Sequence, residues 1–126
     1  MIEGGNASIY VSNMDASVEF FTQVVGLRLR TRVGTDWAEI EAGKGFVIGL
    51  HPAHSGKTVD PGTRGAINVE LNVTRPMEEV VDALKAKGVE FDGPILSYEF
   101  VKIATFKDPD GNAIVLGEVL NTSNPE

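Results

Sequence analysis

The sequence predicts an α+β protein that consists of two tandem βαβββ modules. The first observation behind this prediction is an internal repeat, because a shift of 62 residues lays the first half of the chain over the second without a gap. The second is that each half opens with alternating apolar residues and continues with a helical pattern that ends at a glycine. The matched pairs are Asn6 and Asn68, Ile9 and Leu71, Val11 and Val73, Val18 and Val80, Gly26 and Gly88, Leu27 and Val89, and Leu29 and Phe91. Such an ordered set indicates a duplicated module.

The first module begins with a strand over residues 7–11, where apolar and polar residues alternate. A helix follows, and either Asn13 or Asp15 can accept the free amide hydrogens of its first turn. Gly26 ends this helix. Its apolar face consists of Val18, Phe21 and Val25. Three further strands complete the module, and they are expected at residues 27–33, 37–42 and 45–51.

The second module repeats this pattern, beginning with a strand over residues 69–73. Thr74 is the expected N-cap of its helix, Pro76 suits the first turn, and Gly88 ends it. The apolar face of that helix consists of Met77, Val80 and Leu84. Its three further strands are expected at residues 89–92, 99–106 and 112–118, the last two being joined by a type I turn at Asp108-Pro109-Asp110-Gly111.

Length and composition favour one domain over residues 1–126, with module one at about 6–51, a linker at 52–65 and module two at about 66–118. The 18 acidic and 11 basic residues give a net charge of −7, which argues against a nucleic acid partner. The absence of cysteine excludes disulfides and thiolate chemistry. Since the chain shows neither a signal-peptide pattern nor an apolar run of membrane length, we expect a cytoplasmic protein without a membrane partner.

The stretches "YVSNMDASVEFFTQVVGLRL" and "FKDPDGNAIVLGE" resemble the glyoxalase/bleomycin-resistance/extradiol-dioxygenase superfamily, also called the vicinal oxygen chelate superfamily. The resemblance covers about residues 6–118. It implies that curved mixed sheets from both modules form a concave cup, with the helices outside. It does not imply one activity, because this fold supports several chemistries.

The resemblance also implies where enzymes of this superfamily hold a divalent metal ion, usually with His or Gln, Glu, His and Glu. In this sequence the four corresponding positions are Asn6, Gly49, Asn68 and Val115. Glycine and valine have no side-chain ligand, and asparagine is a poor neutral one. We therefore expect that this inherited metal site is absent and that the protein uses no metal or other cofactor.

His51 and Glu70 could replace the missing groups. Each lies two residues beyond an inherited ligand position, so each projects to the same strand face as that position. The pair could bind a metal ion or serve as a catalytic acid and base. The alternative is that His51 ends a strand and that Glu70 is a hydrogen-bonded wall residue.

The strand face opposite the helices is expected to bind a ligand. If Ala38 and Ile40 face the core, this face combines amide, hydroxyl, carboxylate and aromatic groups, which suits an organic molecule. Alternatively, these polar residues face water, and Trp37 is a dimer contact or a core residue. The residues expected to bind the ligand are Asn6, Tyr10, Trp37, Glu39, Gly49, His51, Asn68, Glu70 and Val115.

The leading hypothesis is a metal-free, homodimeric protein that binds a small organic molecule and sequesters a toxic or antibiotic compound. Its negative charge favours a cationic ligand. The alternative is an enzyme, either a glyoxalase-like lyase or isomerase or a dioxygenase-like protein, with a relocated metal site or with His51 and Glu70 as acid and base. A third hypothesis is a partner-binding or regulatory role, with a vestigial cup.

Overall fold

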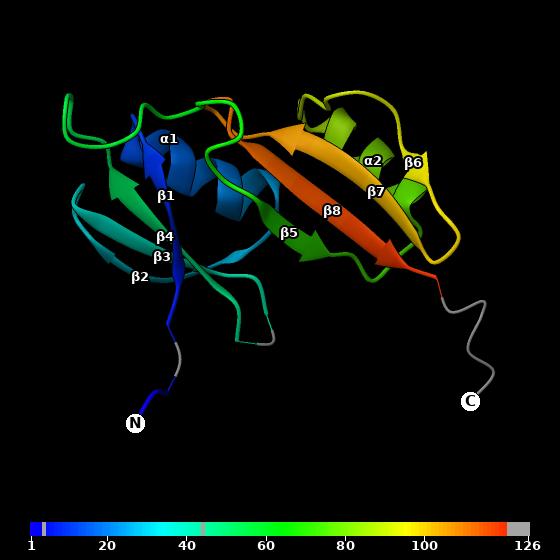
Figure 1. The fold of residues 1–126 in the computed structure, drawn as a ribbon, viewed down its shortest axis with the longest axis horizontal. Coiled ribbons are helices and arrows are strands. Elements are labelled where there is room, and N and C mark those ends of the chain that lie inside the picture. Colours follow the sequence, from blue (N-terminus) through cyan, green and yellow to red (C-terminus); the bar gives the residue numbers. More distant parts are fainter. Residues whose placement is uncertain (4, 44, 121–126) are drawn as a thin grey trace. The chain divides into compact units, whose positions relative to one another are not determined.

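The computed structural model describes residues 1–3, 5–43 and 45–120, and it has the predicted α+β architecture (Figure 1). The elements follow in the order β1 (Ala7–Val11), α1 (Met14–Glu19), the π-helical turn η1 (Phe20–Val24), β2 (Arg28–Val33), β3 (Trp37–Glu41), β4 (Val47–Pro52), β5 (Val69–Asn72), α2 (Met77–Ala86), β6 (Leu96–Ser97), β7 (Val101–Lys107) and β8 (Ala113–Val119).

The chain divides into two compact units, Met1–Ala66 with Pro109–Asn112, and Ile67–Asp108 with the segment that begins at Ala113. The expected single domain over residues 1–126 stays a prediction, and its residues 4, 44 and 121–126 lie outside the described residues. Among the described residues, the structure contains no helix with the length and apolar character that a membrane crossing requires.

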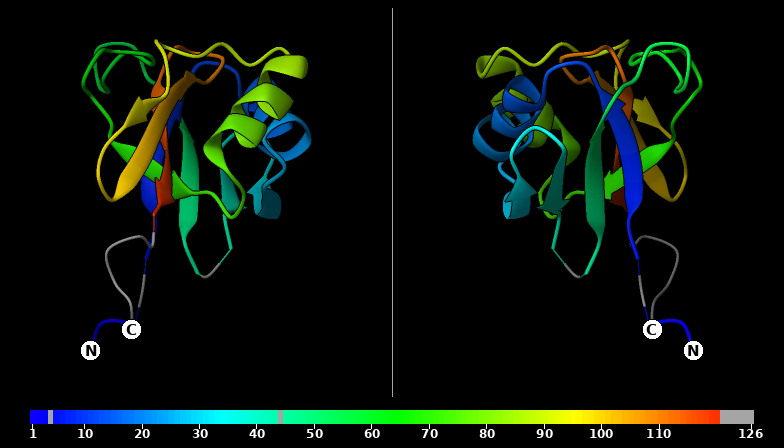
Figure 2. Two further views of the ribbon diagram at one scale, coloured as in Figure 1. Left: turned by 90° about the vertical axis from the view of Figure 1, so that its right-hand side faces the viewer. Right: turned by 90° about the vertical axis from the view of Figure 1, so that its left-hand side faces the viewer.

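Each unit contains an open, mixed sheet of four strands. The strand orders are β1-β4-β3-β2 and β5-β8-β7-β6. In each sheet the first two strands of this order are parallel, as the arrows of β1 and β4 in Figure 1 show, and the other pairs are antiparallel. The right view of Figure 2 shows β1 and β4 side by side. The equivalent strand orders confirm the two tandem βαβββ modules.

The core of the first unit lies between its sheet and its helix. Helix α1 packs against β3 and β4. The apolar residues between the helical segment and the sheet are fully buried, and they are Phe21 of η1 and the strand residues Ile9, Ala38, Ile40, Ile48 and Leu50. The expectation that Ala38 and Ile40 face the core is therefore confirmed. Val25 is only half-buried because the helix loosens into the π-helical turn η1, where Val25 N–H donates to the Phe20 carbonyl at 2.9 Å.

Asn13, rather than Asp15, caps α1. The Asn13 side-chain oxygen accepts a hydrogen bond from the Ala16 amide at 3.0 Å, while the Asp15 carboxylate forms an ion pair with Arg32 of β2. The division of roles follows from position, because only the residue just before the helix has the extended backbone of an N-cap.

Helix α2 of the second unit starts differently from the prediction. Pro76, not Thr74, is the N-cap, and it has no capping side chain. The first free amide, that of Met77, instead donates to the Glu118 carboxylate at 2.8 Å, so a tertiary contact replaces the local cap. Since the helix begins at Met77, its buried face contains Val81, and Val80 is only half-buried.

The prediction of a strand at residues 89–92 is also wrong. That segment makes a single bridge, between Phe91 and Phe106, and the edge strand is β6 instead. The physical reason lies in the next residues, because Gly93 has a φ of 86° and Pro94 has no amide hydrogen to donate to a sheet. The chain therefore turns before a ladder can form.

The turn between β7 and β8 belongs to the first unit. The Asp110 carboxylate accepts hydrogen bonds from the Ser12 amide at 3.1 Å and from the Ser12 hydroxyl. The Asn112 side-chain oxygen accepts one from the Gly62 amide at 2.9 Å. Gly62 has a φ of 83°, and a Cβ atom there would collide with the Asp110 carbonyl. The turn thus fixes both the end of β1 and the segment that follows β4.

Replacing the N-cap tests the start of α1. The substitution Asn13→Ala removes the acceptor for the Ala16 amide, and it should lower the free energy of unfolding by about 1 kcal/mol. Asn13→Asp keeps an acceptor at the same place and should retain the stability. Urea denaturation of the three proteins measures the difference, and equal stability of wild type and Asn13→Ala would contradict this role.

Candidate ligand-binding site

The face of the first sheet that points away from α1 carries most of the predicted site. In the register of the sheet, Ser8 pairs with Gly49 and Tyr10 pairs with His51, while Glu39 pairs with Gly49 from the other side. Paired residues of neighbouring strands point to the same face. The predicted site residues of β1, β3 and β4 are therefore on one surface, here called the first open face: Tyr10, Trp37, Glu39, Gly49 and His51.

The Trp37 ring lies across the backbone of Gly49. A Cβ atom on Gly49 would be 2.9 Å from Trp37 Cζ2 and 2.9 Å from Ser8 Oγ, closer than real Cβ contacts. The glycine therefore allows the indole to lie against β4, and Trp37 is half-buried there. This is the structural reason for a glycine in the middle of an otherwise apolar strand.

The Glu39 carboxylate is fixed in place beside this ring. Trp37 Nε1–H donates to Glu39 Oε2 at 3.1 Å, and the Arg30 guanidinium lies 3.7 Å from the other oxygen. Arg30 lies where the register between β2 and β3 shifts, between Leu29, which pairs with Ile40, and Thr31, which pairs with Glu39. The charge of Glu39 is thus balanced within the first unit.

His51 lies among three aromatic or imidazole rings. Its ring centroid is 5.4 Å from that of Tyr10, 6.3 Å from that of Trp37 and 5.9 Å from that of His54, all with edge-to-face geometry. His51 Nδ1 is 2.8 Å from the Pro52 carbonyl, which only accepts hydrogen bonds. Nδ1 therefore carries the hydrogen, and in the neutral ring Nε2 keeps a lone pair for an outside donor.

The second unit carries the remaining predicted residues. Glu70 of β5 pairs in register with Val115 of β8, so both point to the face opposite α2, here called the second open face. Asn68 is exposed just before β5. In the first unit, Asn6 is likewise exposed before β1, where its side-chain oxygen accepts a hydrogen bond from Ser8 at 3.2 Å. His51 and Glu70 belong to different units, and their joint role as acid and base stays a prediction.

The four positions at which a metal site was implied do not fit a divalent cation. The space that a ligand side chain on Gly49 would need is taken by the Trp37 ring, and Val115 offers no donor atom. Asn6 already accepts a hydrogen bond from Ser8. Within residues 1–3, 5–43 and 45–120, no group of three or more His, Asp or Glu side chains is placed to hold a metal ion.

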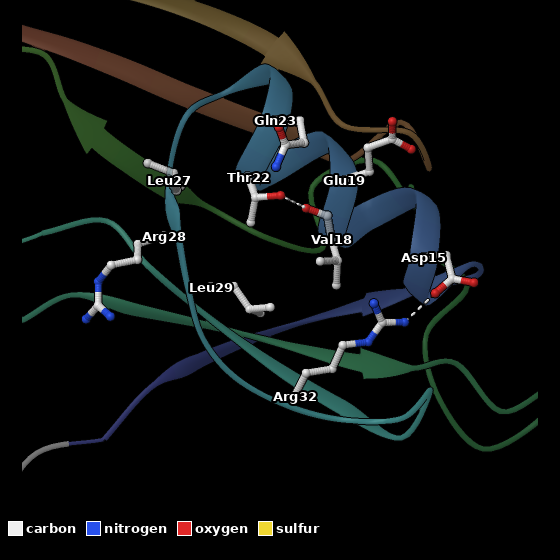
Figure 3. Close-up of a pocket in the computed structure, with 9 residues that line it drawn as sticks. All are labelled: Asp15, Val18, Glu19, Thr22, Gln23, Leu27, Arg28, Leu29 and Arg32. Atoms are coloured by element: carbon white, nitrogen blue, oxygen red, sulfur yellow. Dashed lines mark hydrogen bonds and ion pairs between the residues drawn. The ribbon is translucent and has the colours of Figure 1, made fainter.

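A separate cavity lies on the helix side of the first sheet, between α1–η1 and β2 (Figure 3). Its volume is about 550 Å³, and the ion pair between Arg32 and Asp15 closes one end. The lining residues are Asp15, Val18, Glu19, Thr22, Gln23, Leu27, Arg28, Leu29 and Arg32. Sequence reasoning missed it, because alternation in the strands does not show how far a helix stands from an edge strand.

Comparison with known proteins places this geometry in context. The model of the glyoxalase/bleomycin resistance protein/dioxygenase superfamily matches residues 5–116. A search of curated proteins finds no match. Among solved structures, TnmS3, an antibiotic binding protein from Streptomyces sp. CB03234, is 23% identical with a TM-score of 0.76, covering 94% of this chain and 97% of its own.

Two further structures show the range of the fold. A glyoxalase/bleomycin resistance protein from the same Streptomyces strain is 27% identical with a TM-score of 0.71, covering 89% of this chain and 98% of its own. A lactoylglutathione lyase from Agrobacterium tumefaciens is 15% identical with a TM-score of 0.72, covering 90% of each chain. The likenesses to TnmS3 and to the lyase show the fold alone, so the choice between binding and catalysis depends on the site.

The contact between Trp37 and Gly49 can be tested by fluorescence, because Trp37 is the only tryptophan. The substitution Gly49→Ala forces the ring away from β4, so its emission should shift to longer wavelength. The crowding should also cost about 1–3 kcal/mol of stability. Gly5→Ala is the control, since a Cβ atom there meets nothing within 4 Å. Unchanged emission from a folded Gly49→Ala protein would refute the contact.

Proposed function

Because the chain belongs to the glyoxalase/bleomycin resistance protein/dioxygenase superfamily, we propose that it is a small-molecule binding protein that works without a metal ion. It holds an organic compound against the first open face and releases it chemically unchanged. The biological purpose that suits this action is the sequestration of a toxic or antibiotic compound. The antibiotic-binding protein TnmS3, which has the same fold, supports this purpose.

The observation that carries the proposal is the position of Trp37 on Gly49. Enzymes of this superfamily resemble one another in a metal site, and one of its implied ligand positions here is a glycine covered by an indole ring. An indole offers an apolar, polarisable surface and no metal-binding lone pair. An indole ring in place of a metal ligand therefore favours stacking of a planar compound over metal coordination.

The neighbouring groups suit the orientation of such a compound. Tyr10 is exposed and has a hydroxyl that both donates and accepts. His51 Nε2 can accept a hydrogen bond, because Nδ1 is engaged by Pro52. A flat aromatic surface with a few convergent polar groups is the usual composition of a small-molecule site.

A second candidate function is catalysis by His51. The fixed tautomer of its ring leaves Nε2 as a base, which a proton transfer requires. An assay for the lyase reaction, with and without added Ni²⁺ or Zn²⁺, separates the two functions. Turnover that His51→Ala removes would favour the enzyme, whereas recovery of all substrate would favour binding.

Binding can be measured with acridone, a neutral planar tricycle, by isothermal titration calorimetry. Trp37→Ala removes the stacking surface and should weaken the affinity at least about tenfold, while Trp37→Phe keeps an aromatic ring and should retain part of it. Because Trp37 is only half-buried, the loss of stability should stay below the roughly 3–5 kcal/mol typical of a core aromatic.

The same titration tests whether binding of acridone requires a metal ion. Affinity for acridone should be equal in EDTA and in Zn²⁺ or Mn²⁺, since the proposed contacts need no cation. A requirement for added metal, or full affinity in Trp37→Ala, would contradict the proposed function.

We also propose that the protein is a homodimer. Its edge strand β2 exposes Leu29 and Val33, with 39% and 58% of their surface accessible. An edge strand with apolar side chains is normally covered, and a second copy is the simplest cover. Sedimentation equilibrium at tens of micromolar should give twice the mass of one chain, and the mass of a single chain would contradict the dimer.

A further inference from the structure

We propose that the second open face binds a positively charged organic group, with Glu70 as its counter-ion. The proposed contacts lie wholly within the second unit, and the proposal goes beyond the proposed function because it concerns a face separate from the first open face. It predicts that organic cations, such as protonated aromatic amines, bind more tightly than neutral molecules of the same shape.

The Glu70 side chain lies on the bare backbone of Gly117. A Cβ atom on Gly117 would be 2.5 Å from Glu70 Oε2 and 3.3 Å from Glu70 Cδ. The carboxylate therefore extends along β8 from its register partner Val115 toward Gly117. A residue with a side chain at position 117 would push it away, so the glycine determines where the negative charge sits.

The surface around this carboxylate combines apolar side chains with two polar ones, since Asn72 pairs in register with Gly117 and Thr105 pairs with Val115. In register with Gly117, β7 contributes Ile103, which pairs in turn with Leu96 of β6. Val119 and its partner Val101 follow along the same face. Leu96 and Val119 are 47% and 73% exposed, so this apolar surface is open to a ligand. A carboxylate beside exposed apolar side chains suits a cation attached to a hydrophobic body.

Glu70 differs from the other carboxylates of the two open faces in its partners. Glu39 is bonded by Trp37 and lies near Arg30, and Glu41 forms an ion pair with Arg28. Within the described part of the chain, by contrast, the Glu70 carboxylate has no hydrogen bond or ion pair. A charge without an internal partner is free to pair with a ligand.

The lysines of the same sheet do not compensate this charge. Lys102 points to the helix side, where its ammonium donates to Glu78 at 2.7 Å and lowers the pKa of that carboxyl. Lys107 shares the open face but pairs with Ala113, at the end of β8 opposite to Gly117. With a net charge of −7 on the whole chain, the long-range field also favours a cation.

The test compares two planar tricycles, 9-aminoacridine, which is a cation at neutral pH, and the neutral acridone. Wild type should bind the cation more tightly, and this preference should weaken as salt is raised. Glu70→Gln keeps the shape of the side chain and removes its charge, so it should weaken 9-aminoacridine binding about tenfold and leave acridone unchanged. Calorimetric titration measures all four affinities.

Two further variants keep the test specific. Gly117→Ala displaces the carboxylate without removing it, and it should also reduce the preference for the cation. Glu90→Gln changes the net charge by the same amount at an exposed site of the same unit, and it should retain the preference. Circular dichroism confirms that each variant is folded.

The outcomes separate this inference from the proposed function. Acridone binding that depends on Trp37, together with an unchanged cation preference in Glu70→Gln, would overturn the role of Glu70 and leave the binding function intact. Equal loss of preference in Glu90→Gln would also overturn it, since a general field would then be the cause. Failure of wild type to bind either tricycle would count against both proposals.

Discussion

The close approach of the Trp37 ring to Gly49 is the contact on which the chemistry of the first open face depends. Only glycine lets the indole lie against β4. Once there, the ring directs its N–H to Glu39 and fixes that carboxylate beside Arg30, and it forms one wall of the surroundings of His51. A metal ligand at position 49 and an indole at position 37 would compete for the same space. At position 49 the residues present form an aromatic surface, because the Trp37 ring fills the space that a ligand side chain would need.

Most of the architecture can be predicted from the sequence because it depends on local periodicity. Alternation along residues 7–11 and 37–42 correctly divides buried from open faces, and the glycines at positions 26 and 88 end their helices with positive φ. The prediction fails where a residue far away in the sequence determines where an element begins. The start of α2 depends on Glu118, which no local pattern indicates.

The candidate site is likewise predictable only where it depends on local sequence patterns. Alternation is sufficient to bring Tyr10, Trp37 and Glu39 to one face of the sheet. It cannot show that Arg32 leaves this face, because the shift in register after Leu29 pairs Arg32 with the buried Ala38. Nor can it show which residue covers Gly117. A glycine inside a strand is nevertheless a visible signal of close approach, and both strand glycines of the described residues turn out to be covered by a neighbouring side chain.

The two modules share a fold and differ in chemistry for a physical reason. The faces covered by α1 and α2 must exclude water, so both copies keep the same alternation of buried apolar residues, including Ile9 and Leu71 at equivalent positions. The open faces carry no such constraint and have diverged. The first is aromatic, with its carboxylates paired internally. The second carries apolar side chains beside the Glu70 carboxylate, which has no partner among the described residues. Duplication thus supplies one scaffold with two surfaces, and the chemistry of each surface is set by the side chains of its own unit.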